Sequence, residues 1–353
     1  MMAQRNETID AFRGVAIIAV LLFHYLVRWA PPYSAVDVTQ LAWVYPKVLL
    51  MGQFGVQLFF VVSGLVIAMT LLRSRSVFQF AVNRFARLYP AFIVAATGTF
   101  LLTLAWNPFR FGVSGLDYLL NLTMFAHLLG GTFVDGVYWT LEVELLFYGF
   151  AALSWLVLKD RFWIALIALG FVGALAGPVL PVLTTLLIAP HLPFFLFGIA
   201  LWLGLFEPYR AGSRGLSMRH EAIWPAGAAL VLYAVHAPSL ALETLPVWAP
   251  HLVILGTIAT LSVFLATDQV KQWGPLSFAG RISYSLYLIH QVLGVTAIGV
   301  MTRAGAPDWL AVSLTSAVLS LTAWLMYRYV EIPAGRRVKE FVNRQPITAR
   351  FLN

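Results

Sequence analysis

Long apolar runs constrain the fold of this chain more than any other feature. A helix needs about 20 consecutive apolar residues to cross the hydrocarbon of a bilayer. About ten stretches approach that length, near residues 9–27, 48–72, 88–106, 138–158, 162–180, 182–206, 222–240, 247–267, 279–300 and 307–330. Of the 353 residues, 60% are hydrophobic and 11% are charged, and the mean hydropathy is +0.83. Soluble domains are about half apolar and a quarter charged. We therefore predict an all-α, polytopic integral membrane bundle.

The basic residues predict its orientation. An even number of spans puts both termini on one side of the membrane, where 19 of the 23 Lys and Arg residues then fall, against four on the other. The positive-inside rule places that side in the cytoplasm. The formal net charge of +8 then follows from topology, and we predict no nucleic acid partner. We divide the chain into a transmembrane domain (1–335) and a short basic cytoplasmic tail (336–353) that contacts membrane lipids.

The first apolar stretch, "TIDAFRGVAIIAVLLFH" at residues 8–24, contains three ionisable groups. His24 follows Arg13 by eleven positions, a rotation only about 20° past three helical turns, so the two share one stripe about 16 Å apart along the axis. Asp10, three residues before Arg13, joins that stripe. Burying one such group near the bilayer centre costs about 3 kcal/mol, so the stripe should face the bundle interior or water. The alternative is an interfacial Asp10–Arg13 pair with His24 as a polar belt residue.

Six motifs occur in a fixed order along the chain. They are "DAFRGVAIIAVLLFH" (10–24), "GQFGVQLFFVVSGLVI" (52–67), "NRFARLYP" (83–90), "YWTLEVELLFY" (138–148), "RISYSLYLIH" (281–290) and "YRYVEIP" (327–333). Together the chain resembles the acyltransferase-3 family of bacterial membrane-bound O-acyltransferases over essentially its whole length. The resemblance implies a multi-pass protein of the bacterial inner membrane. Such a protein would transfer an acyl group, usually acetyl from acetyl-CoA, to a hydroxyl of a sugar, polysaccharide or lipid-linked glycan.

The resemblance also implies site residues. The family's Arg and His of the first span match Arg13 and His24, and its Arg-x-x-Arg between the second and third spans matches Arg84 and Arg87. Its fourth span matches Trp139, Glu144, Phe147 and Tyr148. One departure is Glu142, where the family more often has a small polar residue.

These residue types suit acyl transfer on physical grounds. A neutral imidazole can take the proton of an attacking hydroxyl near pH 7, which makes His24 the candidate base. A carboxylate, Glu144 or secondarily Asp10, would orient that imidazole. Guanidinium groups match the phosphates of acyl-CoA, and we assign Arg13, Arg84 and Arg87 to them. Arg13 is also assigned to the catalytic group with His24, Glu144 and Asp10. The alternative for Arg84 and Arg87 is that they are topological anchors. To substrate binding we assign Trp139, Tyr148, Tyr284 and His290; a structural histidine is the alternative for His290.

Further expectations concern less specific features. We expect Ser63 and Gly64 to serve close helix packing, Glu331 to cap or anchor the last span, and the connection 107–137 to contain an interfacial or re-entrant helix. The histidines lack metal-ligand spacing, so we predict no metal. Two rival classes remain: a glycan or lipid carrier or flippase that uses the same interior charges, and a membrane sensor or assembly subunit.

Overall fold

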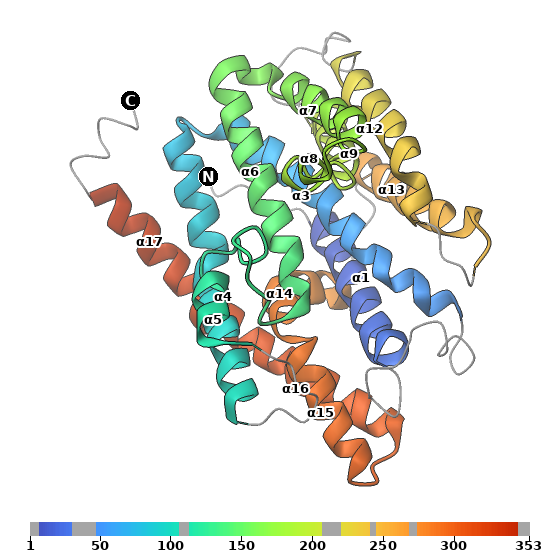
Figure 1. Cartoon of the computed structure of the whole chain (residues 1–353). Helices are drawn as coiled ribbons and strands as arrows, with labels where there is room; N and C mark the ends of the chain where they lie inside the picture. The colour runs from blue at the N-terminus through green and yellow to red at the C-terminus, as the bar shows by residue number, and fades with distance from the viewer. Residues whose placement is uncertain are drawn as a thin grey trace.

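The chain forms a bundle of helices (Figure 1). The computed structural model describes residues 7–29, 47–105, 113–206, 220–240, 245–267 and 274–344, and every regular element in these ranges is a helix. Seven helices are long and apolar enough to cross a membrane, or eight if one bent pair counts as a single span; two shorter apolar helices accompany them. Each of the ten predicted stretches therefore contains a helix, and the all-α polytopic architecture is confirmed. The cytoplasmic placement of the termini stays a prediction.

The elements that build the bundle follow one another in chain order. The first half contains α1 (Glu7–Phe23), η1 (His24–Arg28), η2 (Lys47–Phe54), α3 (Gly55–Arg73), α4 (Val77–Ala105), α5 (Gly115–Asn121), η3 (Gly136–Tyr138), α6 (Trp139–Leu158) and η4 (Lys159–Arg161). Next come α7 (Trp163–Ala176), α8 (Pro181–Leu186), α9 (Leu192–Leu201), η5 (Trp202–Phe206), α12 (Ile223–His236), η6 (Ala237–Leu240) and α13 (Trp248–Thr267). The last are α14 (Gly274–Ile289), α15 (Val292–Arg303), α16 (Asp308–Met326), η7 (Tyr327–Glu331) and α17 (Ile332–Arg344).

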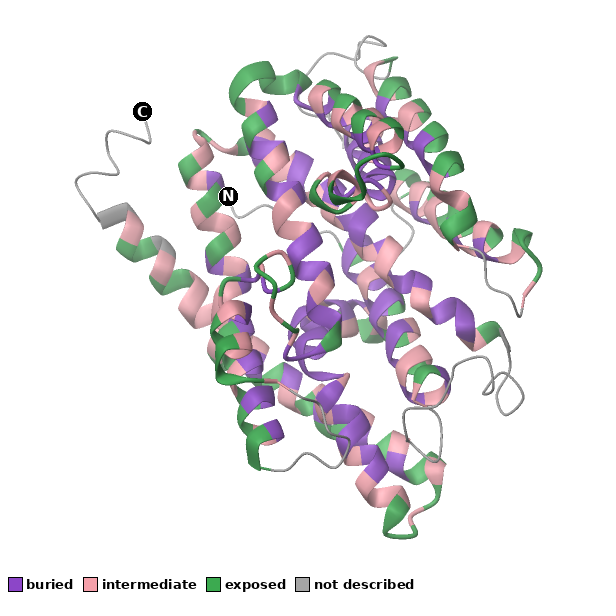
Figure 2. Ribbon diagram, in the orientation of Figure 1, coloured by how far each residue is buried: buried purple, intermediate pink, exposed green. Residues whose placement is uncertain are grey.

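Burial in the bundle has the pattern of a membrane protein. Large apolar side chains lie on the outside, including Trp224 at 67% exposure and Leu252 at 64%. Ionisable side chains lie inside, including Asp10, His290 and Glu331. Figure 2 shows the buried residues concentrated on the central helices α1, α3, α6 and α14. Because lipid offers no hydrogen bonds, polar groups at this depth must be satisfied by the protein or line a cavity.

Two predicted boundaries are wrong. The third span begins at Val77 rather than near residue 88, so Arg84 and Arg87 lie on α4 and not on a loop. The last helix does not end at Glu331 either. It continues through the π-turn η7 and past Pro333 into α17, which lies beside α4 (Figure 1). Hydropathy averaging misses both segments because each is amphipathic and carries arginine, whose charged head reaches away from the lipid.

Helices α1 and α14 pack closely and run in the same direction. Their closest approach is at two glycines: a Cβ on Gly14 would meet the main chain of Leu276, and one on Gly280 would meet the main chain of Asp10. Ser277 also donates to the carbonyl of Glu7 at 3.3 Å. The contacts advance from Glu7 with Ser277 to Asp10 with Gly280 and then to His24 with His290, so the two helices are parallel. Glycine permits this approach because it has no side chain at the contact.

The connection before α6 is more irregular than predicted. Its helix, α5, is only seven residues long and starts with a capping box between Ser114 and Asp117. Turns follow it, and Glu142 of α6 holds them by accepting the main-chain N–H groups of His127 at 3.1 Å and Leu128 at 3.4 Å. The residue that departs from the family pattern therefore has a local structural role.

Candidate active site

A cavity of about 110 Å³ lies among α1, α3, α4, α6 and α14. Six of the predicted site residues line it: Arg13, Arg84, Arg87, Glu144, Tyr148 and Tyr284. They come from four helices that are far apart in the sequence. The cavity therefore gathers three guanidinium groups and one carboxylate within an otherwise apolar bundle. Such groups are costly there, and they mark functional sites.

Arg84 presents hydrogen-bond donors to this cavity. Its Nη2 donates to Thr70 Oγ1 at 3.1 Å, and its guanidinium carbon lies 5.8 Å from the ring centres of both Phe80 and Tyr148. Its Nε is buried and has no hydrogen-bond partner among the described residues. A guanidinium has five N–H donors, so Arg84 retains capacity to bind an anion.

Arg87, whose side chain is 29% exposed, forms an ion pair with the buried Glu331 of η7. Ser285 of α14 donates to the same carboxylate at 3.1 Å, and the Arg87 guanidinium lies 5.3 Å from the ring centre of Tyr284. Glu331, 5% exposed, thus joins three elements and does not cap the last span. Its role depends on contacts that no local pattern reveals.

Glu144 is not the partner of His24. It accepts hydrogen bonds from Ser63 Oγ at 2.7 Å and from the Tyr148 hydroxyl. Ser63 and Gly64 were both expected to serve close helix packing, and only Gly64 does so: a Cβ there would meet the main chain of Phe195. Ser63 instead lines the cavity. The carboxylate is therefore a fixed part of the cavity wall on α6.

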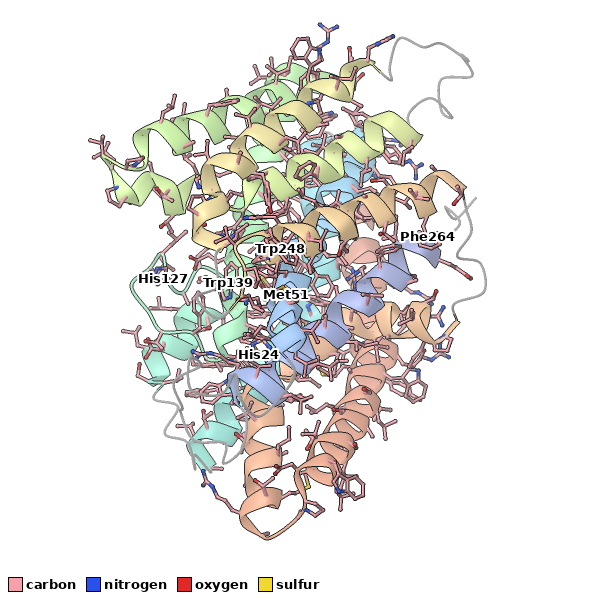
Figure 3. All side chains as sticks on the ribbon, turned by 90° about the vertical axis from the view of Figure 1, so that its right-hand side faces the viewer. His24, Met51, His127, Trp139, Trp248 and Phe264 are labelled. Carbon is pink, nitrogen blue, oxygen red and sulfur yellow. The ribbon has the colours of Figure 1, made fainter. Side chains whose placement is uncertain are left out.

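The partner of His24 is His290. Nδ1 of His24 lies 3.3 Å from Nε2 of His290 and 2.9 Å from the carbonyl oxygen of Val20, and the two ring centres are 4.9 Å apart. His24 begins the π-turn η1, near the middle of the molecule in Figure 3. Such turns occur often at functional sites. His290 is fully buried between α14 and α15.

The carbonyl contacts fix the tautomers of both rings. A carbonyl oxygen only accepts, so His24 donates Nδ1–H to Val20, and His290 donates Nδ1–H to the carbonyl of Tyr287 at 2.7 Å. Nε2 of neutral His290 then accepts from His24 in a three-centre arrangement. Nε2 of His24 keeps its lone pair, which is the form that a general base requires.

A bent helix places His290 at this position. The axes of α14 and α15 meet at 76°, and the break frees main-chain groups that need partners. Tyr25 donates to the carbonyl of His290 at 2.8 Å, Tyr138 donates to the carbonyl of Leu288 at 3.1 Å, and Asp135 accepts from the N–H of Val292 at 3.0 Å. A Cβ on Gly294 would collide with the Tyr25 hydroxyl, so this position needs glycine.

Asp135 gives a pH-dependent test of the break. Burial raises the pKa of its carboxyl from 3.8 to about 7, although the N–H groups of Val292 and Val137 oppose the rise. The folded protein then holds this proton more tightly than the unfolded chain, so the free energy of unfolding should fall as the pH rises from about 4 to 7. Asp135→Asn should remove that slope. It should also cost about 1–3 kcal/mol, because the two carboxylate oxygens each accept a hydrogen bond and the amide nitrogen accepts none.

The measurement is thermal unfolding in detergent across this pH range. Asp160→Asn, at an exposed position, is the matched control and should keep the wild-type slope. An unchanged slope in Asp135→Asn would contradict this account of the break.

Two further predicted residues, Trp139 and Asp10, are not among the residues that line the cavity. The ring of Trp139 lies 6.2 Å from that of Phe60, which lines the cavity, and 5.2 Å from that of His191. Asp10 is buried and its carbonyl lies against Gly280. The structure therefore places Trp139 beside the cavity and Asp10 at the α1–α14 contact. Their roles stay predictions.

The sequence did not reveal that His24 and His290 are paired. Nor did it reveal the hydrogen bonds of Tyr25 and Asp135 at the helix break or the ion pair of Glu331 with Arg87. One signal was present: "GVAIIAVLLFH" (14–24) and "GRISYSLYLIH" (280–290) both read Gly, nine residues, His. Two parallel helices in contact at those glycines bring both histidines to the same level, ten residues further along. The signal has meaning only once the two helices are known to be neighbours.

No group of three or more His, Cys, Asp or Glu in the described ranges is arranged to hold a metal ion. A family model described as an acyltransferase domain matches residues 6–328. Neither the curated proteins nor the solved structures include a match to the chain.

Proposed function

Since the chain belongs to the acyltransferase-3 family and is a multi-pass membrane protein, we propose that it transfers an acetyl group from acetyl-CoA to a hydroxyl of a cell-envelope sugar, polysaccharide or lipid-linked glycan in the bacterial inner membrane. The observation that carries the proposal is the arginine-lined cavity with a histidine pair near one end. Arg13, Arg84 and Arg87 belong to the donor site, and His24 is the base.

The size of the cavity agrees with part of the donor entering it. Pockets that enclose a drug-sized ligand measure about 300–1,000 Å³, so a cavity of about 110 Å³ cannot hold a whole coenzyme A. The slender pantetheine arm suits the cavity, while the charged nucleotide stays at its arginine-rich mouth. Guanidinium forks match the pyrophosphate and ribose phosphate of that nucleotide.

The histidine pair lies next to this cavity. Tyr287 lines the cavity, and its ring centre is 5.3 Å from that of His290. On an ideal helix His24 lies about 16 Å along α1 from Arg13. Phosphates bound near the arginines would therefore leave the thioester, at the far end of the arm, beside the pair.

The transfer follows from this arrangement. Nε2 of His24 takes the proton of the acceptor hydroxyl as its oxygen attacks the thioester carbonyl. The carbon–sulfur bond then breaks, the new carbon–oxygen bond completes the ester, and the departing coenzyme A thiolate takes the proton from His24. The chemistry needs no metal, and the metal-free site stays a prediction.

The test uses radiolabelled acetyl-CoA and the purified protein with a lipid and polysaccharide extract of a bacterial envelope. We expect base-labile label in the glycan or lipid fraction, and none above background with His24→Ala. Equal label with both proteins would overturn the proposal. Movement of a glycan across vesicles without any donor would support the carrier alternative.

Arg84→Ala tests the donor site. The lost contacts hold the phosphates equally in the ground and transition states, so the KM for acetyl-CoA should rise about 10- to 100-fold while kcat changes little. The matched control is Arg75→Ala, an exposed arginine in the turn before α4, which should leave the KM unchanged. An unchanged KM in Arg84→Ala would instead support the reading of Arg84 as a topological anchor.

A further inference from the structure

We propose that His290 is the positioning residue of His24: its Nε2 accepts the Nδ1–H of His24, holds that ring in place and stabilises the imidazolium formed during transfer. This inference rests on the proposed function. It gives His290 a role different from substrate binding, and it replaces Glu144 with a neutral partner.

The hydrogen bonds give His290 a defined polarity. Its Nδ1–H is donated to the carbonyl of Tyr287 at 2.7 Å, so the ring nitrogen facing His24 is an acceptor. When His24 gains the hydroxyl proton at Nε2, both of its nitrogens carry hydrogen. Its Nδ1–H then becomes a charge-assisted donor, about twice as strong as a neutral one.

A neutral partner suits the surroundings of the pair. His290 is fully buried, and burying a permanent carboxylate there would cost several kcal/mol. With His290 as partner, charge is present at the pair only while the proton is in transit. The surrounding contacts of Tyr25, Tyr138 and Asp135 hold the main chain on either side of His290, so its acceptor nitrogen has a fixed direction.

Two amide variants separate positioning from a structural role. The side-chain amide of Asn lies where Nδ1 of His lies and retains the hydrogen bond to Tyr287. The longer amide of Gln reaches the place of Nε2 and retains an acceptor for His24. His290→Gln should therefore stay within about 10-fold of the wild-type kcat, whereas His290→Asn should lose about 100-fold. The KM for acetyl-CoA should change little in either variant.

The kinetics are measured on detergent-purified protein together with the midpoint of thermal unfolding. Equal kcat losses in the two variants, or losses confined to KM, would overturn the proposal. A measurement on the wild type does not depend on the folding of either variant: ¹⁵N NMR of histidine-labelled protein should show His24 protonated at Nδ1. An Nε2–H tautomer would overturn the proposal.

Failure of the proposed function has a different signature. If the wild type itself transfers no label from acetyl-CoA, the donor assignment is wrong. If the wild type transfers label and His290→Asn transfers it equally well, the proposed function is supported and the positioning role of His290 is wrong.

Discussion

His24→Ala is expected to lower acyl transfer by about 10³-fold or more. Removing a general base, the role proposed for His24, costs about 10²- to 10⁴-fold, and the loss also leaves the buried Nε2 of His290 without its partner. The protein should still fold, because the helix continues through η1, and the hydrogen bonds and ring contacts of the His24 side chain are few: they involve Val20, His290 and Phe23. The measurement is the initial rate of label transfer, with thermal unfolding recorded on the same samples.

The matched control is His127→Ala. His127 is exposed on the connection before α6, away from His24 in Figure 3, and its side chain contacts Phe133. This variant should keep the wild-type rate. A folded His24→Ala protein that retains more than a few per cent of the wild-type rate would remove His24 from the mechanism.

Of all these variants, Arg87→Ala is expected to lower the free energy of unfolding most. It leaves the carboxylate of Glu331, 5% exposed, without its ion-pair partner, and such a loss costs about 3–5 kcal/mol. Arg87→Ala combined with Glu331→Gln should regain most of that stability, because the buried charge is then gone. The midpoint of thermal unfolding in detergent reports both effects.

Arg84→Ala serves as the control for this comparison. Arg84 lies one helical turn from Arg87 and donates to the hydroxyl of Thr70, so its removal leaves no buried carboxylate without an ion-pair partner. Its unfolding midpoint should stay close to that of the wild type. If the single Arg87 variant and the double variant unfold at the same temperature, the pair with Glu331 does not contribute as described.

Sequence patterns predicted the architecture because the bilayer imposes a strong and local requirement. Each helix must supply its own apolar surface, so all ten stretches were visible one by one. The starts and ends were less visible. Val77 to Arg87 carries charge yet is helical, and Pro333 lies within a helix that continues past it. In these two segments the helix is stabilised by tertiary contacts, which an average of hydropathy along the sequence does not include.

The residues of the site, like the helices, were predictable in part. Arg13, Arg84, Glu144 and Tyr148 could be located because each lies within a recognisable motif, and the structure gathers them at one cavity. The partner of His24 could not be identified, because it lies 266 residues away and depends on the packing of two helices. A pattern in one segment gives residue types, but a hydrogen bond between segments depends on register and direction.

The end of α14 beside the histidine pair has an electrostatic consequence. The peptide dipoles of a helix sum to about half a negative charge at its C-terminus. The carbonyl of Tyr287, in the last turn of α14, accepts from His290 at 2.7 Å, and His24 lies 3.3 Å from the same ring, so the C-terminus of α14 lies beside both rings. Under the proposed function, His24 would be positive only while it holds the acceptor's proton. The field would then favour the transition state over the resting protein, by up to about 2 kcal/mol in a partly buried site. By bending at His290, the span makes its own main chain the source of negative potential at His24.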